Sequence, residues 1–563
     1  MSFVINGEII YKREHYSAEE LRQQVRSAEL WLNQYTMCKD RPVALLMNRT
    51  PKLLTVIFAL LGQKIPFLPL DAQMPMNRLD YMLKSAQVEY VVSDVLTIDT
   101  FCECKVLDFN NRQESAVTEM ATNKPSELAY LLFTSGTTGY PKAVEVYRKG
   151  LINFIDAIPK CVRFPENTRI ACTTNATFDI FFLESVMALC HGMTVVLADD
   201  KERSNPRMLR DIILNDEVNT LQMTPSMLFM LQMADADLDF LKGIDVLMLG
   251  GEQFPERMLK KLQGVVRGRI YNMYGPTETT IWSAVADLTE AEEVTIGSPI
   301  QNTEIFIVED ERILADGEEG EIVIAGDGLA RGYCNNPEKT AQNFMMLDCK
   351  GTLKRVYKTG DLGYFTEKKT LICKGRKDLQ VKILGHRIEL GDVEENIRRI
   401  NGIDNAAVAT YGEDIKRLIC FYIGDSQKSE EMLETEARKY LPVYMIPDKW
   451  VCVSAILYTA SGKADRNAMI NQYMPNMEDE REAKEEELSE DEQKLAEYFS
   501  LKGKTFDLNA RVKDMVSDSI EYIEFMVYLE ECLDIDMEDE VLSSDYFETM
   551  RDIAAYCKKA KEE

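Results

Sequence analysis

The sequence predicts an α/β protein with a second, smaller α+β domain and an all-helical tail. From about residue 40 to residue 330, short β-branched runs such as Val43–Asn48 and Ile244–Gly250 alternate with longer amphipathic stretches. This alternation is typical of α/β units with mostly parallel strands. A further strand-like run at Gly320–Gly326 indicates a β-rich region. We therefore expect a large α/β core over residues 1–377 that includes a β-rich subdomain.

The pattern of the sequence changes after residue 377. LQVKILGHRIEL alternates as a pair of strands does, and GDVEENIRRI follows with helical spacing, so we expect a small α+β domain over residues 378–472. The glutamate-rich residues 473–489 predict a charged linker. In residues 490–563, Ile520, Ile523 and Val527 fall on one helical face, which predicts a bundle of four helices.

Composition excludes several classes of function. The chain carries 65 Lys and Arg against 94 Asp and Glu, a net charge of −29, which disfavours nucleic acids and anionic membranes as partners. Apolar runs are too short to span a bilayer and the N-terminus lacks a secretory pattern, so we expect a cytoplasmic protein. Its 13 Cys are then expected to be reduced thiols, and three His argue against a histidine-rich metal site.

The stretch LLFTSGTTGYPKAV, Leu131–Val144, is the first with a chemical signature. An apolar strand end precedes hydroxyls and glycines that can continue neither a strand nor a helix. The hydroxyls and free N–H groups, with Lys142 at their end, suit a multiply charged anion such as a triphosphate. The Walker A pattern is absent. A flexible surface loop is the alternative interpretation.

Three more stretches place reactive side chains on turns. In NMYGPTETT, Tyr274 offers an aromatic face for a purine, and Glu278 offers a carboxylate that can hold Mg²⁺ beside phosphates. In YKTGDLG, Asp361 can accept ribose hydroxyls. In YTASGKADR, Lys463 lies on a flexible turn from which it can reach a cleft. Each stretch alone is equally compatible with an ordinary surface turn.

In this order the stretches resemble the adenylation domains of nonribosomal peptide synthetases, which are adenylate-forming enzymes. FDIFFLE (Phe178–Glu184), GEIVIAGDGLARGYCNNPEKT, GRKDLQVKILGHRIELGDVE and LPVYMIP follow in the family's order, and the resemblance spans about residues 1–470. Tyr140 and Ala143 replace the more usual Lys and Gly, and Phe181 stands where Ser is common.

The resemblance implies that a substrate carboxylate attacks the α-phosphate of ATP. The phosphate loop with Lys142 would hold the β,γ-phosphates, Glu278 would ligate Mg²⁺, and Lys463 would bridge the carboxylate and the phosphates. Asp378 would be the hinge of the small domain, a lid whose rotation replaces Lys463 by Lys382 and Gly385. The implied ATP site consists of Thr134, Ser135, Gly136, Thr137, Thr138, Gly139, Lys142, Asn272, Tyr274, Gly275, Thr277, Glu278, Asp361, Arg376 and Lys463.

The resemblance also implies a substrate pocket in which Asp179 pairs with the α-ammonium of an amino acid. The remaining implied pocket residues are Ile180, Leu183, Gln222, Met248, Gly250, Met273, Ile281 and Trp282. The set is similar to the family's glycine-selecting pattern, with large residues that leave little room for a side chain. Alanine is the second choice. A D-alanine carrier ligase, an acyl- or aryl-CoA ligase and a silent scaffold remain alternatives.

The tail contains VSDSIEYIEFMVYLEE, which resembles a carrier-protein motif. Ser519 would take a 4′-phosphopantetheine arm at a helix start, where the positive helix end favours a phosphodiester. The alternative is that Ser519 merely caps the helix. Peptidyl carriers more often read G-G-x-S, so the carrier type stays open. The implied partners are a phosphopantetheinyl transferase and a downstream acceptor or condensation enzyme on another protein.

Overall fold

The computed structural model divides the chain into two compact units. The larger comprises Met1–Gln232 and Asp237–Arg466, and the smaller comprises Asn467–Glu563 with Met233–Ala236. The residues that the structure describes are 3–35, 37, 40–95, 104–112, 125–136, 140–234, 237–349, 351–377, 380–383, 385–412, 416–425, 427–458, 464–474, 490–502, 506, 508, 510–516, 519–533, 535, 547 and 549–562.

The larger unit contains a mainly parallel sheet whose strand order is β15-β14-β13-β12-β11-β9-β10-β1-β2. Pairs β1–β10, β9–β10, β9–β11, β11–β12 and β12–β13 are parallel. The strands are β1 (Glu8–Tyr11), β2 (Glu14–Tyr16), β9 (Arg169–Cys172), β10 (Thr194–Leu197), β11 (Thr220–Met223), β12 (Val246–Gly250), β13 (Arg269–Tyr274), β14 (Ala284–Asp287) and β15 (Ser298–Pro299).

A second sheet of the larger unit has the order β19-β8-β7-β4-β3-β5-β6. Its strands are β3 (Val43–Leu46), β4 (Phe67–Pro69), β5 (Tyr90–Ser93), β6 (Lys105–Asp108), β7 (Leu128–Thr134), β8 (Lys142–Tyr147) and β19 (Gly332–Tyr333). Helix α2 (Pro51–Gln63) is apolar on nearly all sides and belongs to one core with residues of both sheets, as expected for a buried helix. The predicted α/β alternation is confirmed.

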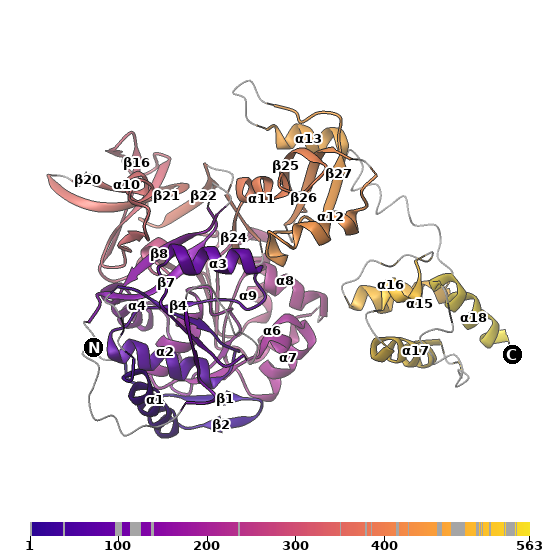
Figure 1. The fold of residues 1–563 in the computed structure, drawn as a ribbon, viewed down its shortest axis with the longest axis horizontal. Coiled ribbons are helices and arrows are strands. Elements are labelled where there is room, and N and C mark those ends of the chain that lie inside the picture. The colour runs from indigo at the N-terminus through magenta and orange to yellow at the C-terminus, as the bar shows by residue number, and fades with distance from the viewer. Residues whose placement is uncertain are drawn as a thin grey trace. The chain divides into compact units, whose positions relative to one another are not determined.

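Further helices of the larger unit precede the lid region, and Figure 1 labels most of them. They are α1 (Ala18–Leu32), α3 (Met76–Ser85), α4 (Arg148–Cys161), α5 (Ala188–Cys190), α6 (Asp200–Ser204), α7 (Pro206–Asn215), α8 (Pro225–Ala234), α9 (Glu256–Val265) and α10 (Pro337–Asn343), with a π-helical turn at Leu183–Met187. Within the described part of the chain, no helix combines the length and apolarity needed to cross a bilayer.

A β-rich region follows and contains the strand predicted at Gly320–Gly326. Strands β16 (Thr303–Glu309), β17 (Arg312–Ile313), β18 (Gly320–Gly326), β20 (Phe344–Cys349), β21 (Thr352–Phe365) and β22 (Leu371–Arg376) pair antiparallel. In Figure 1 the β20–β21 hairpin lies at the end of this region. Strands β21 and β22 bring Asp361 opposite Arg376.

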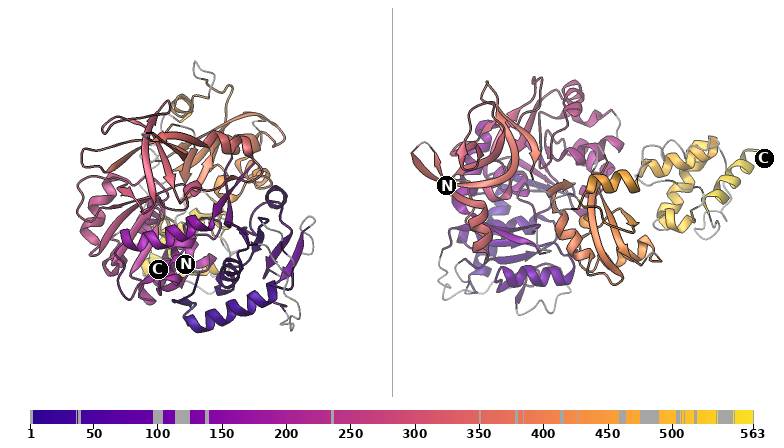
Figure 2. Two further views of the ribbon diagram at one scale, coloured as in Figure 1. Left: turned by 90° about the vertical axis from the view of Figure 1, so that its left-hand side faces the viewer. Right: turned by 90° about the horizontal axis from the view of Figure 1, so that it is seen from above.

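Residues 380–458, here called the lid segment, have sheets and a core of their own. The elements are β23 (Gln380–Ile383), β24 (His386–Glu389), α11 (Leu390–Ile397), β25 (Ile403–Tyr411), β26 (Arg417–Gly424), α12 (Glu430–Ala437) and β27 (Lys449–Cys452). The predicted strand pair and following helix are therefore confirmed. Figure 2 shows this segment in orange. The predicted boundaries at residues 377 and 472 stay predictions.

The smaller unit contains α13 (Arg466–Tyr473), α15 (Glu490–Leu501), α16 (Val512–Met515), α17 (Ser519–Leu533) and α18 (Met550–Glu562). Leu495, Phe499, Phe525, Leu529 and Ile553 belong to its hydrophobic core. Among the described residues after 489, four helices are present. The assignment of this region as a four-helix carrier domain stays a prediction. Most of the predicted linker, and the side chains of Ile520, Ile523 and Val527, lie outside the described residues.

Candidate active site

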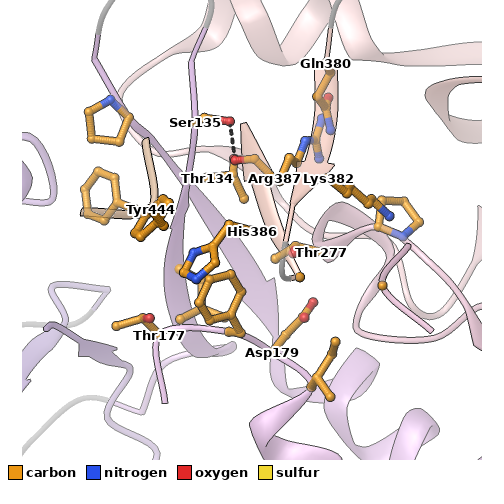
Figure 3. Close-up of a pocket in the computed structure, with 18 of the residues that line it drawn as sticks. Thr134, Ser135, Thr177, Asp179, Thr277, Gln380, Lys382, His386, Arg387 and Tyr444 are labelled. Atoms are coloured by element: carbon orange, nitrogen blue, oxygen red, sulfur yellow. Dashed lines mark hydrogen bonds between the residues drawn. The ribbon is translucent and has the colours of Figure 1, made fainter. Parts of the chain in front are cut away.

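One pocket of the larger unit is lined by residues of both the core and the lid segment. Figure 3 shows Thr134, Ser135, Asp179 and Thr277 from the core, with Arg387 of the lid segment nearby. The predicted site residues that line this pocket are Thr134, Ser135, Asp179, Ile180, Tyr274, Gly275, Thr277, Trp282, Asp361 and Arg376. Motifs far apart in the sequence are thus gathered at one place.

The phosphate loop leaves β7 and returns in β8, with Thr134 opposite Lys142. Ser135 Oγ donates a hydrogen bond to the carbonyl oxygen of Arg387 at 2.7 Å. The buried Thr134 hydroxyl has no hydrogen-bond partner among the described residues. A Cβ at Gly136 would lie 2.1 Å from the Tyr140 carbonyl oxygen, so only glycine fits there. Thr137, Thr138 and Gly139 lie outside the described residues.

Glu278 is fully buried and surrounded by donors and cations. The Nη1 atom of Arg387 donates to its two carboxylate oxygens at 2.8 and 3.1 Å, and the Tyr333 hydroxyl donates at 2.8 Å. Lys142 Nζ lies 3.8 Å from the same carboxylate. Burial alone would raise the pKa of Glu278, but Arg387 and Lys142 outweigh it and hold the pKa at about 2.

This environment decides how well Glu278 fits the Mg²⁺ role implied by the sequence. Mg²⁺ requires anionic or neutral oxygen ligands in near-octahedral geometry. Here the carboxylate already has two cations and a hydroxyl donor. Among the described residues, no cluster of three or more His, Cys, Asp or Glu could hold a metal ion. In this arrangement the residues therefore do not fit Mg²⁺.

The sequence analysis missed both principal partners of Glu278. Arg387 lies in the motif GRKDLQVKILGHRIELGDVE, and Tyr333 lies in the motif GEIVIAGDGLARGYCNNPEKT. Both motifs could be recognised in the sequence, but the pairing of Glu278 with residues 109 and 55 positions away could not be predicted from it. Lys142, as predicted, is close by, and burial lowers its pKa to about 8.

At the other end of the pocket, the two oxygens of Asp361 are held in place. The Tyr274 hydroxyl donates to Oδ2 at 2.6 Å, and Arg376 Nη1 donates to Oδ1 at 2.9 Å. Asn272 is buried and its amide donates to the Thr295 carbonyl oxygen at 2.8 Å. It is not among the pocket-lining residues, and neither are the predicted site residues Gly136, Lys142 and Glu278. Asp378 and Lys463 lie outside the described residues.

Asp179 lies just before the π-helical turn Leu183–Met187. Glu184 anchors this turn because its buried carboxylate accepts from the backbone N–H groups of Thr173 and Thr174 at 2.8 and 2.9 Å. The Asp179 side chain is buried, and its Oδ2 has no hydrogen-bond partner among the described residues. Burial raises the pKa of Asp179 to about 6. A cation that enters the pocket would therefore stabilise the ionised form of this carboxylate.

Trp282 lines the same pocket as Asp179. A Cβ on Gly250 would lie 2.8 Å from Trp282 Cη2 and 2.6 Å from the Met273 carbonyl oxygen, so the indole fits against a glycine. Thr280 and Ile281 precede it with φ values of 65° and 68°, a strained conformation for β-branched residues. The predicted pocket residues Leu183, Gln222, Met248, Met273 and Ile281 are all buried, but they are not among the residues that line the pocket.

The lid segment contributes its β23–β24 hairpin to the pocket. Lys382, Gly385 and Arg387 are among the lining residues, in agreement with the predicted lid residues Lys382 and Gly385. The Gly385 N–H donates to Glu252 Oε1 at 2.7 Å. The φ of Gly385 is +79°, which favours glycine. His386 stacks on Tyr444 with ring centroids 3.7 Å apart.

A second contact joins the lid segment to the core at helix α3. Arg78 Nη2 lies 2.9 Å from Asp392 Oδ2, with both side chains buried. Asn396 donates to the other Asp392 oxygen at 2.9 Å, so the carboxylate is fully satisfied. Breaking a buried pair of this kind leaves an uncompensated charge. The pair therefore holds α11 against α3 in the arrangement described.

Comparison with known proteins shows the family of this chain. Residues 5–334 match the family described as AMP-binding enzyme. A dimodular nonribosomal peptide synthase of Bacillus subtilis (strain 168) is 33% identical over 442 residues, which is 76% of this chain and 18% of that protein. The chain spans 18% or less of the first curated relatives' lengths. Zwittermicin A synthase ZmaJ of Bacillus cereus is 30% identical over 482 residues, 82% of this chain and 91% of that protein.

Two solved structures share the fold. Holo-PA1221, a nonribosomal peptide synthetase protein with adenylation and carrier domains bound to a vinylsulfonamide inhibitor, has a TM-score of 0.76 at 23% identity, covering 99% of this chain and 94% of that one. Holo-AB3403, a four-domain nonribosomal peptide synthetase bound to AMP and glycine, has a TM-score of 0.59 at 26% identity, covering 99% and 42%. The chain belongs to the AMP-binding enzymes, a family of ATP-dependent ligases, and within it to the adenylation domains of nonribosomal peptide synthetases.

Proposed function

We propose that the chain activates glycine with ATP to glycyl-AMP and pyrophosphate, and then loads it as a thioester on its own tail. The observation that carries this proposal is the buried Asp179 carboxylate with an unpartnered oxygen at the pocket. An α-ammonium group supplies the missing charge and donors, because an opposite charge favours the ionised carboxylate. An acyl or aryl acid without an amine would leave the carboxylate unpaired.

We infer glycine as the substrate because the bulky Trp282 lines the same pocket as Asp179. The Trp282 indole packs against Gly250. The other predicted pocket residues are large and buried. Selection against alanine then comes from a clash between its methyl group and Trp282. A missing methyl alone is worth only about 1–3 kcal/mol, so a steric barrier is the stronger discriminator. The related four-domain enzyme bound to AMP and glycine is consistent with this choice.

In the first step the glycine carboxylate attacks the α-phosphate of ATP. A bond forms between a carboxylate oxygen and the α-phosphorus, and the bond from that phosphorus to the pyrophosphate oxygen breaks with its electron pair. Thr134, Ser135 and Lys142 are the groups that would hold the departing phosphates, and Asp361 the ribose. Lys463 would bridge the carboxylate and the phosphates. These residues act by positioning and by neutralising charge.

Magnesium is the metal typically used with ATP by adenylate-forming enzymes. When bound, it would supply charge neutralisation of the phosphates. The arrangement around Glu278 does not fit this ion, so the steps proposed here depend on the protein's own side chains. Lys142 and Arg387 supply positive charge at that end of the pocket.

The second step is proposed to use a phosphopantetheine arm on Ser519, the first residue of α17. A helix N-terminus favours the phosphodiester of that arm. The thiol sulfur would attack the glycyl carbonyl carbon, AMP would leave with the bonding electron pair, and the thiol proton would pass to solvent. Lys382 and Gly385 line the pocket where this attack would occur. A phosphopantetheinyl transferase and a downstream acceptor or condensation enzyme would be partners.

Amino-acid-dependent exchange of labelled pyrophosphate into ATP tests the first step. We expect glycine to give the highest rate among the common amino acids, D-alanine and aryl acids. A preference for D-alanine would instead indicate a D-alanine carrier ligase, and no exchange with any acid would indicate a silent scaffold. For the second step, intact mass spectrometry of the phosphopantetheinylated chain should show one added glycyl group, and Ser519→Ala should abolish it.

A further inference from the structure

Arg49 is a buried arginine that contacts the segment leading to Asp179. It lies in the loop between β3 and α2 and is only 6% exposed. Its guanidinium donates to the backbone carbonyl oxygens of Cys172 and Ala198, each at 2.6 Å, and to that of Thr174. Strand β3 belongs to the second sheet, whereas β9 and β10 belong to the mainly parallel sheet. One side chain therefore fastens the carboxyl ends of β9 and β10 to the other sheet.

Glu184 binds the same segment from the far side of Asp179 in the sequence. Its carboxylate is fully buried and accepts from the N–H groups of Thr173 and Thr174 at 2.8 and 2.9 Å. It also accepts from the Thr174 hydroxyl at 2.5 Å. Thr174 is five positions before Asp179, and Glu184 is five positions after it. The carboxylate therefore ties together the two ends of the loop 174–184, which carries Asp179.

The two buried charges act on the same residue, Thr174. Glu184 binds its N–H and hydroxyl groups, and Arg49 binds its carbonyl oxygen, so each polar group of Thr174 has a partner. The Arg49 guanidinium also lies 5.2 Å from the centroid of the Phe181 ring, a favourable cation–π arrangement. Phe181 is fully buried and follows Asp179 by two positions. Arg49 therefore contacts the loop both before and after Asp179.

The charges of Arg49 and Glu184 depend on each other. Burial raises the pKa of Glu184, while its hydrogen bonds from Thr174 and the positive charge of Arg49 oppose that rise. Removal of one member of such a buried set leaves the other without compensation. Because both act on the loop 174–184, the structure most affected by such a loss is the loop that places Asp179.

We propose that Arg49 is a positioning residue for amino-acid binding, which together with Glu184 clamps the loop 174–184 so that the Asp179 carboxylate faces the pocket. This inference rests on the proposed function, in which Asp179 binds the substrate ammonium group. Asp179 lines the pocket and Arg49 does not, so Arg49 acts through the loop. The groups proposed for ATP, such as Tyr274 and Asp361, are carried by β13 and β21 instead. Loss of Arg49 should therefore weaken amino-acid binding selectively.

Pyrophosphate exchange with separate titrations of glycine and ATP tests this selectivity. We expect Arg49→Gln to raise the KM for glycine about tenfold or more, because small displacements of a binding group are costly, and to change the KM for ATP by less than about twofold. Arg49→Lys keeps the charge with fewer donors and should raise the KM for glycine less. An equal rise in both KM values, or an unchanged KM for glycine, would overturn the inference.

Arg355→Gln is the matched control. Arg355 also donates to two backbone carbonyl oxygens, those of Ala330 and Arg331 at 2.8 Å, and its guanidinium lies 4.4 Å from the centroid of the Phe344 ring. It makes the same kinds of contact as Arg49 but is not in the loop 174–184 or the pocket lining. Both KM values of this variant should stay within about twofold of the wild type. A rise in the KM for glycine equal to that of Arg49→Gln would reduce the effect to a general loss of structure.

A double-variant cycle provides a readout that a purely structural role would not move. Because Arg49→Gln and Glu184→Gln act on one loop, their combined effect on the KM for glycine should be well below the product of the single effects. Arg49→Gln combined with Arg355→Gln should give about that product. If the first pair also gives the full product, Arg49 and Glu184 act independently and the inference fails.

A milder variant decides the question if the Arg49 variants do not fold, as judged by circular dichroism. Thr174→Val removes only the hydroxyl that Glu184 accepts, so the KM for glycine should rise about threefold with an unchanged KM for ATP. An unchanged KM for glycine would then overturn the clamp.

The outcomes separate this inference from the proposed function. If the wild type shows no amino-acid-dependent exchange, the proposed function fails and the inference fails with it. If the wild type prefers another amino acid, the KM for that amino acid tests the inference in the same way. If glycine-dependent exchange is present but Arg49→Gln leaves the KM for glycine unchanged, the inference alone fails.

Discussion

In the proposed function Asp179 binds the amino group of the substrate, and its burial lowers the stability of the fold. Burial raises the pKa of Asp179 to about 6. Above that pH the folded protein holds a buried charge that the unfolded chain exposes to water, so the free energy of unfolding is lower. Asp179→Asn should abolish glycine-dependent pyrophosphate exchange yet stabilise the protein by about 1–3 kcal/mol at pH 7 to 8. Chemical denaturation measures the gain, which should shrink toward pH 4 because wild-type Asp179 is then neutral in the folded state. Asp404→Asn, at an exposed position, should change neither property. Lower stability of Asp179→Asn would contradict this account.

The pH dependence of kcat/KM follows from two residues. Asp179 must be ionised to bind the ammonium, so kcat/KM for glycine should fall as the pH drops below about 6. Lys142 must be protonated to bind phosphates, and burial lowers its pKa to about 8, so kcat/KM for ATP should fall above that pH. Pyrophosphate exchange from pH 5 to 9 tests both limbs. If the same fall in rate below about pH 6 is seen in a reaction that does not use glycine, Asp179 is not its cause.

Trp282 is the residue expected to exclude alanine. Trp282→Leu opens the volume next to Gly250, so alanine should gain on glycine by about ten- to a hundredfold in the ratio of kcat/KM values. Exchange rates with both amino acids measure this ratio. Trp450→Leu, at a buried tryptophan of the lid segment's own core, is the matched control and should leave the ratio unchanged. A Trp282→Leu ratio equal to the wild-type ratio would place the selection elsewhere.

At the residue scale, the sequence predicted several of the side chains that share the pocket, but not the hydrogen bonds and ion pairs that they form. Thr134, Tyr274 and Asp361 were predicted to share a site, and all of them line one pocket. Asn272 was predicted to join them, but its side-chain amide donates a hydrogen bond to the Thr295 carbonyl oxygen, in the loop before β15. Arg387 and Tyr333 could not be assigned to Glu278, because such pairs depend on how distant segments pack.

At the scale of elements, the Arg78–Asp392 ion pair fixes helix α11 against α3. Asp392→Ala should destabilise the larger unit by about 3–5 kcal/mol, because it leaves a buried arginine unpaired. Urea denaturation measures this loss. The double variant Arg78→Met with Asp392→Leu removes both charges and should recover most of it. Equal stabilities of the single and double variants would contradict a charge-based role for the pair.

Strand positions were predictable from the sequence, while strand order was not. The runs Val43–Asn48 and Ile244–Gly250 contain β3 and β12, since buried parallel strands read as continuous apolar segments. The placement of β1 beside β10 depends on pairing between residues about 186 positions apart. The π-helical turn after Asp179 was also unpredictable, because its cause is the buried Glu184 that accepts from Thr173 and Thr174.

At the scale of the whole molecule, activation and loading should be separable. The described residues that line the pocket all belong to the larger unit, and the smaller unit has a hydrophobic core of its own. A chain ended after residue 474 should therefore keep glycine-dependent pyrophosphate exchange within about threefold but lose self-loading. Intact mass and exchange assays on the two chains measure both. Loss of exchange on truncation would mean that the tail is needed for the first step.

The most direct test of the central claim is pyrophosphate exchange by the wild type with glycine and with alanine, run beside Asp179→Asn. The account predicts fast exchange with glycine, much slower exchange with alanine, and none above background for the variant. Fast exchange by Asp179→Asn, or a preference of the wild type for a larger or amine-free acid, would contradict the assignment of Asp179 and Trp282 as the glycine pocket.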